Sequence, residues 1–258
     1  MIAATASLRE CLLGKPDVAS AVIAYLTLGD PANDFTDCAQ TIIDAGALTL
    51  ELGVPLDAPR EGEILLASHR RARAGGTDED KALALLSTVH RANPSVPLIA
   101  VNQWQALGDS NSLGSFVTRA SSAGASAVLI VGLPFGQLGC FRSACDDVNI
   151  ESVLSCFPDT PGRMRSMIYR HCTGCIYVAR SRGTSGGEAA VSVDDLCREI
   201  RSETDVPLIV GFGITDAAAV SRVCAAGAHA AVVGSAVVER VAEDRTTGAR
   251  FMAGLLGK

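Results

Sequence analysis

The sequence Pro207-Leu-Ile-Val-Gly-Phe-Gly-Ile214 is followed, later in the chain, by Ala230-Ala-Val-Val-Gly-Ser235. Each contains a short run of apolar, β-forming residues that ends in glycine, before a segment with a helical pattern. Because neither run alternates with polar residues, each predicts a strand that is buried on both faces, as in a parallel sheet. We therefore expect strands at 206–211 and 229–234.

The glycines at the ends of these two runs suggest a binding function. Gly211 and Gly213 lack side chains where the first strand opens into a loop, and Gly234 and Ser235 precede a helical segment at 236–240. Glycine lets a ligand approach the backbone, and a helix N-terminus offers N–H groups and the positive end of a dipole. Two such ends side by side would form an anion cup, most naturally for phosphate. The alternative is that the glycines only end the strands.

Six similar runs precede these two along the chain, at 21–27, 48–54, 96–102, 127–134, 152–157 and 175–180. Helical patterns separate the runs, and this alternation predicts parallel strands with right-handed crossovers. Eight such units in 258 residues predict an α/β fold, a single (β/α)8 TIM barrel over residues 1–258, because such barrels take about 250 residues. An open doubly wound sheet is the alternative, but no Gly-x-Gly-x-x-Gly follows the first strand.

The helices have recognisable ends in the sequence. A short helix at 8–13 leads the chain, and Asp34, Thr77 and Ser192 stand where N-capping residues are expected. Several helical segments end in Ala-Gly, at 45–46, 123–124 and 226–227. These signals support the division of the chain into repeated strand–helix units.

Composition narrows the class of protein. The chain is 48% hydrophobic and carries a net charge of −6 with scattered charges, which argues against nucleic acid and anionic membrane surfaces as partners. No apolar run approaches the roughly 18 residues of a membrane span, and the N-terminus lacks the basic start of a signal peptide. We expect a cytoplasmic protein.

The chain contains nine cysteines, and this odd count suggests reduced, buried thiols. Metal or redox use of Cys172-Thr-Gly-Cys175 is the less favoured alternative.

A glutamate interrupts the second predicted strand, at Glu51 between Leu50 and Leu52. An ionised carboxylate in such a run is unfavourable unless it is paired, and burial raises its pKa. Because the working face of a barrel lies at the carboxyl ends of its strands, Glu51 is a candidate general acid or base. A structural salt bridge is the alternative. Asp57 and Glu61, on the following loop, are candidates for a second carboxylate, unless each is simply solvated.

Other residues are expected at the same face. Tyr25 near the end of the first strand could stack on an aromatic substrate or pack in the core. Asn102, which ends the third strand, and Tyr177, in the sixth, could bind a ligand or fill the barrel. The Gly- and Ser-rich segment 181–187, which contains Gly186, is a candidate lid, with an ordinary surface loop as the alternative. The four histidines look helical or peripheral and are assigned no chemistry.

Five motifs in this chain resemble the tryptophan synthase α-subunit family. They are residues 24–31 (AYLTLGDP), 50–55 (LELGVP), 182–186 (RGTSG), 211–214 (GFGI) and 233–236 (VGSA). The motifs follow the family's order, near its spacing, over essentially the whole chain. The resemblance implies a lyase of tryptophan biosynthesis that needs no cofactor. It would cleave indole-3-glycerol phosphate to indole and glyceraldehyde-3-phosphate by a retro-aldol reaction.

The resemblance also implies roles for single residues. Glu51 is expected to protonate the indole ring carbon and to handle the glycerol hydroxyl proton. Tyr177 falls on a family active-site tyrosine, and Tyr25 falls where the family places an aromatic side chain against the indole. Phosphate binding is implied for Gly186, Gly213, Gly234 and Ser235.

The loop after Glu51 departs from the family pattern. Residues 55–63 are shorter and rewritten, and Glu61, followed by Gly62, is the nearest counterpart of the family's catalytic loop aspartate. The end of the third strand differs as well, so the phosphate half of the site is kept and the indole half is altered. Three functions stay open: an indole-3-glycerol phosphate lyase, a lyase for a different phosphorylated substrate, or a catalytically weak subunit that binds a tryptophan synthase β-type partner.

Overall fold

The eight apolar runs form one closed barrel of parallel strands, in which each strand pairs with the next and the last pairs with the first. The strands are β1 (Val22–Thr27), β2 (Thr49–Gly53), β3 (Leu98–Gln103), β4 (Ala127–Val131), β5 (Glu151–Cys156), β6 (Ile176–Val178), β7 (Leu208–Val210) and β8 (Ala230–Val233). The computed structural model describes residues 5–14, 21–31, 34–59, 61–179, 192–211 and 213–257. Pairing of Val22 with Ala231 closes the ring, which confirms the predicted TIM barrel and rules out an open sheet.

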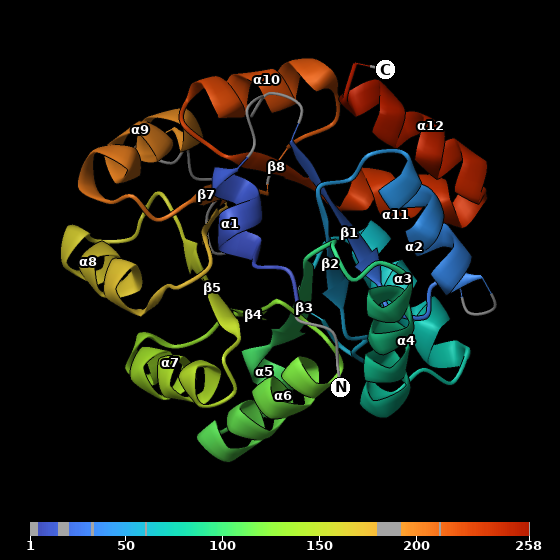
Figure 1. Ribbon diagram of the computed structural model, residues 1–258, viewed down its shortest axis with the longest axis horizontal. Helices are drawn as coiled ribbons and strands as arrows, with labels where there is room; N and C mark the ends of the chain where they lie inside the picture. The colour runs from blue at the N-terminus through green and yellow to red at the C-terminus, as the bar shows by residue number, and fades with distance from the viewer. Residues whose placement is uncertain are drawn as a thin grey trace.

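Helices surround the barrel on its outside (Figure 1). They are α1 (Leu8–Leu13), α2 (Phe35–Asp44), α3 (Glu63–Ala74), α4 (Glu79–Ala92), α5 (Trp104–Leu107), α6 (Ser110–Ser122), α7 (Leu138–Asp147), α8 (Gly162–His171), α9 (Val193–Glu203), α10 (Ala217–Ala225), α11 (Ser235–Glu243) and α12 (Arg245–Leu255), with a short 3-10 turn at Phe135–Gln137. The short α5 and the 3-10 turn are not predicted by the sequence pattern. Among the described helices, none is long and apolar enough to cross a membrane.

Side chains on each strand alternate between two apolar clusters. On β2, Leu50 and Leu52 belong to the outer cluster, which lies between the barrel and its helices. On β3, Ile99 and Val101 belong to the inner cluster, which fills the barrel. Since the period of a strand is two, Glu51, between Leu50 and Leu52, points into the barrel.

One end of the barrel is closed by α1, which lies over its centre in Figure 1. Leu8 and Leu12 of this helix join the inner cluster and are fully or almost fully buried. Ser7 Oγ and the backbone N–H of Arg9 donate to the two carboxylate oxygens of Glu151 at the start of β5, at 2.6 and 2.9 Å. The N-terminal end of the barrel is thus filled, and any open space lies at the other end.

Of the three predicted N-caps, Ser192 is confirmed, Asp34 takes the N-cap position without a capping bond, and Thr77 is wrong. Asp34 precedes α2, but its side chain makes no capping hydrogen bond and lies 3.6 Å from Arg245 instead. The backbone of Asp34 is not in the extended conformation that aims a capping side chain at the helix. Thr77 is buried, and the cap of α4 is Asp78, one residue later. Ser192 caps α9 as predicted.

Candidate active site

A cavity of about 470 Å³ lies at the carboxyl ends of the strands. Inward-facing residues of the strands and the loops that follow them line it, among them Tyr25, Glu51, Val101, Leu129, Tyr177, Gly211 and Gly234. The cavity is therefore at the end of the barrel where this architecture places its active sites. Its lining includes the carboxylates of Glu51 and Glu61, the phenols of Tyr25 and Tyr177, and the glycines that follow β7 and β8.

Glu51 is the buried acid of this cavity. Its side chain is 2% exposed, and Oε1 has no hydrogen-bond partner among the described residues. Burial, and then the nearby charge of Glu61, raise the pKa of Glu51 to about 8. No arginine or lysine of the described residues forms a salt bridge with it. Glu51 holds a proton at neutral pH and has an oxygen free to meet a ligand.

Glu61 brings a second carboxylate to the same cavity from the loop before α3. Gln103 Nε2 donates to its Oε1 at 2.9 Å. Its Oε2 is buried and lies 3.5 Å from His69 Nε2, a contact too long for a well-formed hydrogen bond. Glu61 thus accepts a hydrogen bond from Gln103 at one oxygen, and its other oxygen lies near His69 without a hydrogen-bond partner among the described residues.

The two tyrosines of the cavity each cover a glycine of the neighbouring strand. A Cβ atom at Gly53 would collide with the ring of Tyr25, and one at Gly211 would collide with Tyr177. Tyr177 Oη donates to the carbonyl of Gly211 at 3.4 Å. Burial first, and then the charge of a cavity glutamate, raise the pKa of both phenols well above the usual value. Both rings therefore present neutral hydroxyl groups.

Glycines line the part of the cavity wall that follows β7 and β8. Gly213 has φ +65°, and a Cβ there would meet nothing within 4 Å. Gly234 precedes α11, whose first residue, Ser235, also lines the cavity beside Thr215. The first N–H groups of a helix lack intrahelical acceptors, and together with the dipole they favour a negative ligand. The described residues that line the cavity include no lysine or arginine, so the groups there that could face an anion are backbone N–H groups and hydroxyls.

Asn102 does not reach the cavity, contrary to the sequence prediction. Its Nδ2 donates to Glu79 Oε2 at 3.3 Å, in the helix layer. The reason is the strand alternation, which turns Val101 and Gln103 inward and Asn102 outward. Gln103, which follows it, supplies the amide that contacts Glu61.

The loops differ in what they contribute. Asp57 is exposed and pairs with Arg73 at 2.8 Å, so Glu61 rather than Asp57 supplies the second carboxylate. Gly186 and the candidate lid at 181–187 lie outside the described residues.

His69 is a residue of this region that the sequence analysis assigned no chemistry. His69 lies on α3, is 1% exposed, and contacts both Tyr25 and Glu61. A histidine two turns into the helix that follows an active-site loop is the signal that could have found it. The prediction that the histidines are peripheral is wrong for His69, because this face of α3 is turned toward the cavity.

The Cys172 and Cys175 side chains lie in the core. Cys172 and Cys175 are both buried, and burial raises the pKa of the Cys172 thiol to about 12. The pair therefore belongs to the core. Within the described ranges, no group of three or more His, Cys, Asp or Glu side chains is placed to hold a metal ion.

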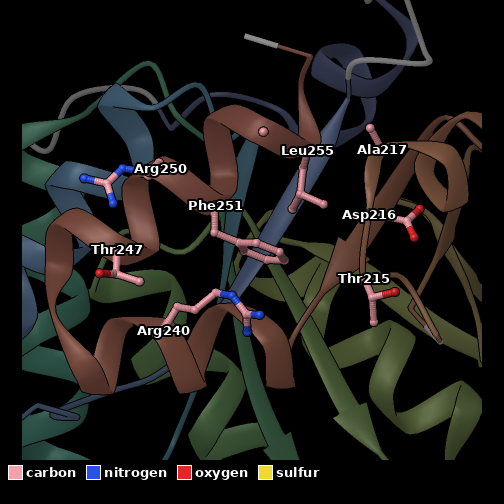
Figure 2. A pocket seen from close by; sticks show the side chains of 9 residues that line it. Thr215, Asp216, Ala217, Arg240, Thr247, Arg250, Phe251 and Leu255 are labelled. Atoms are coloured by element: carbon pink, nitrogen blue, oxygen red, sulfur yellow. The ribbon is translucent and has the colours of Figure 1, made fainter.

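A second cavity, of about 420 Å³, lies between α10, α11 and α12 (Figure 2). Arg240 stacks there on Phe251, with its guanidinium 4.5 Å from the ring centre. Thr215 lines both cavities. None of the buried, unpartnered side-chain atoms found in the described residues belongs to this second cavity, whereas Glu51 and Glu61 supply two in the barrel. The barrel cavity is therefore the candidate active site.

Comparison with known proteins agrees with this geometry. The family described as tryptophan synthase alpha chain matches residues 15–254. The tryptophan synthase alpha chain of Haloferax volcanii is 31% identical over 234 residues, which cover 88% of this chain and 83% of that one. That of Psychrobacter sp. (strain PRwf-1) is 32% identical over 231 residues, 85% and 80% of the two chains. A structure from the study of mutual activation of the tryptophan synthase α2β2 complex of Pyrococcus furiosus matches with TM-score 0.81 and 25% identity, over 93% and 98% of the chains. The chain thus belongs to the tryptophan synthase alpha chain family, and it is a lyase of that type.

Proposed function

We propose that this protein cleaves indole-3-glycerol phosphate to indole and glyceraldehyde-3-phosphate, with Glu51 as the general acid and base. Members of the family cleave this substrate. The observation that carries the proposal is the state of Glu51, which is buried in the cavity with a pKa raised to about 8 and an unpartnered oxygen. A group with that pKa can both give and take a proton near neutral pH.

The reaction needs one proton to move in each direction. Glu51 gives its proton to the ring carbon of the indole that bears the side chain, and that ring loses its aromatic bonding. The resulting carboxylate then takes the proton of the adjacent glycerol hydroxyl. As the O–H electrons form the aldehyde, the carbon–carbon bond breaks and its electrons restore the indole. Glu51 ends protonated, so the cycle balances without a cofactor.

Glu61 is suited to the indole nitrogen. Its Oε2 is buried and has no hydrogen-bond partner in the described structure, so an indole N–H would satisfy it. A negative charge at this place stabilises the positive charge that develops on the ring when its carbon is protonated. The longer side chain of Glu61 serves here where the family uses a loop aspartate.

The phosphate is proposed to bind at the part of the cavity wall that follows β7 and β8. Gly213, Gly234 and Ser235 offer backbone N–H groups and a hydroxyl around the start of α11. Gly186 remains a prediction outside the described residues. Binding at this wall would set the glycerol carbons between the phosphate and Glu51, which brings the reacting bond to the acid.

Indole release from indole-3-glycerol phosphate by the isolated protein tests the proposal. Glu51→Gln removes the proton donor while preserving side-chain size, and it is expected to lower kcat by about a hundredfold or more. Glu79→Gln, which changes a carboxylate of the helix layer, is the matched control and should retain activity. Release by Glu51→Gln at a rate near that of the parent would remove Glu51 from the chemistry. No release by the parent would favour another phosphorylated substrate.

We also infer that a tryptophan synthase β-type subunit binds this chain. The support is its likeness to the chain from the Pyrococcus furiosus α2β2 study. Size-exclusion chromatography of the two subunits, alone and mixed, measures the association directly. Two unshifted peaks at micromolar concentrations, with unchanged indole release, would contradict it.

A further inference from the structure

His69 lies between two side chains of the cavity. Its Nδ1 accepts a hydrogen bond from the backbone N–H of Leu56 at 2.9 Å. Its Nε2 lies 3.3 Å from Tyr25 Oη and 3.5 Å from Glu61 Oε2. Because Nδ1 acts as an acceptor, the single ring proton of a neutral imidazole is on Nε2. The Nε2–H group is therefore directed at the phenol and the carboxylate.

Glu61 is supported from its other side by a series of amides. Gln103 Nε2 donates to Glu61 Oε1 at 2.9 Å. Gln105 Nε2 in turn donates to Gln103 Oε1 at 2.9 Å and to the carbonyl of Ala58 at 2.7 Å. The carboxylate thus accepts a hydrogen bond from β3 on one side and lies 3.5 Å from His69 of α3 on the other, although it comes from a loop.

We propose that His69, as a neutral Nε2–H donor, is a positioning residue that holds Glu61 in the cavity opposite Glu51. The activity tests of this assignment rest on the proposed function, whereas the geometry of the contacts does not. Leu56 N–H fixes the ring and its tautomer, and the ring fixes the carboxylate. A glutamate on a rewritten loop, with one more rotatable bond than aspartate, needs such a restraint to hold one orientation.

The neutral state of the ring matters for the neighbouring acid. A protonated ring would direct an Nδ1–H at the N–H of Leu56, so two donors would oppose each other. With a neutral His69, the charge of Glu61 is not cancelled by a cation and acts on Glu51. The titratable groups that face Glu51 are Glu61, Tyr25, Tyr177 and Cys175. Those that face Glu61 are Glu51, His69, Tyr25 and Tyr177.

Two substitutions separate the functions of the two ring nitrogens. His69→Asn places an amide oxygen near Nδ1, so it can keep the contact with Leu56 but has no donor at Nε2. His69→Gln places an amide N–H near Nε2 and restores the donor. We expect His69→Asn to lower kcat about tenfold or more, with KM nearly unchanged, and His69→Gln to recover most of the loss. The high-pH limb of kcat/KM should move to lower pH in His69→Asn, because Glu61 no longer stays beside Glu51.

A double-mutant cycle identifies the residue through which His69 acts. In a Glu61→Gln background, His69→Asn should cost little more activity, because its target has already changed. His171→Asn, on α8 and outside the cavity, is the matched control. Equal losses for His69→Asn and His69→Gln, or full additivity in the cycle, would overturn the proposal.

The histidine tautomer gives a readout that does not depend on activity. Nitrogen-15 NMR of the parent should show His69 with an unprotonated Nδ1 and a protonated Nε2 at pH 7. The opposite tautomer, or a charged ring, would overturn the proposal even in an active enzyme. An inactive parent with the expected tautomer would instead count against the proposed substrate.

Discussion

The two cavity glutamates have different surroundings. Glu51 has a buried oxygen without a partner, whereas Glu61 accepts a hydrogen bond from Gln103 and faces His69. Like charges close together in a buried site are not both favoured, so one carboxyl keeps its proton. Here the proton belongs on Glu51, because burial and the charge of Glu61 raise its pKa.

A pH profile tests this division at the level of one residue. The pKa of Glu51 is raised to about 8, so the acid form that begins the reaction is lost above that pH. We expect kcat/KM for indole-3-glycerol phosphate to fall about tenfold per pH unit above pH 8. Circular dichroism at each pH checks that the fold persists. A profile that stays flat up to pH 10 would contradict the assignment.

The same group makes stability depend on pH. Burial raises the pKa of Glu51 from 4.5 to about 8, so between these values the native state holds a proton that the unfolded chain has lost. The free energy of unfolding therefore falls as pH rises through this window. Glu51→Gln has no carboxyl group to titrate, so its free energy of unfolding does not fall in this way. The difference in free energy of unfolding, variant minus parent, should therefore be about 3 kcal/mol larger at pH 8 than at pH 5. Urea unfolding at both pH values measures the change, and a pH-independent difference would refute it.

What the sequence predicted about single residues depended on the local pattern. Glu51 stood out because a charge interrupted an apolar run, and the structure places it in the cavity. Asn102 failed because an end-of-strand position does not say which face a side chain takes, and one residue reverses that face. His69 could not be found from periodicity, since its role depends on a backbone N–H thirteen residues away.

At the scale of elements, α11 connects the fold to the proposed phosphate site. Its N-terminus begins at Gly234, where an added Cβ would meet only Tyr25 Cβ at 3.8 Å, an ordinary contact. The position therefore has room for a small side chain. The sequence predicted this helix because an apolar run that ends in glycine, followed by a helical pattern, can be recognised from neighbouring residues alone.

Gly234→Asp tests the cup. The aspartate fits the space but places a negative charge beside the helix N-terminus, where the substrate's phosphate would bind. We expect KM for indole-3-glycerol phosphate to rise by roughly tenfold or more, because like charges oppose each other there. Gly234→Ala, which adds bulk without charge, is the control and should change KM less. Equal effects of the two substitutions would show that crowding, and not charge, is responsible.

At the scale of the whole molecule, stability and chemistry lie at opposite ends of the barrel. α1 fills the N-terminal end with Leu8 and Leu12 and is tied to Glu151, while the glutamates and the anion cup lie at the other. The eightfold alternation of strands and helices could be read from the sequence because each unit is local. How α1 plugs the barrel could not, since it depends on contacts between residues far apart in the chain.

Leu12→Ala tests this separation. Removing most of a side chain that is 1% exposed leaves a cavity and should reduce the free energy of unfolding by about 2–4 kcal/mol. Below the new melting temperature, kcat and KM for indole-3-glycerol phosphate should match those of the parent. Denaturant unfolding and steady-state kinetics on the same preparation measure both. A large fall in kcat without loss of stability would show that the two ends are coupled.

The two tyrosine–glycine pairs have a consequence for engineering this enzyme. Tyr25 occupies the room that a side chain at Gly53 would need, and Tyr177 does the same at Gly211. A directed-evolution library that varies either glycine alone should return glycine. A library that varies each glycine together with its tyrosine can combine a larger residue at the glycine position with a smaller one at the tyrosine position. Such variants would have a cavity of a different shape and could accept different substrates.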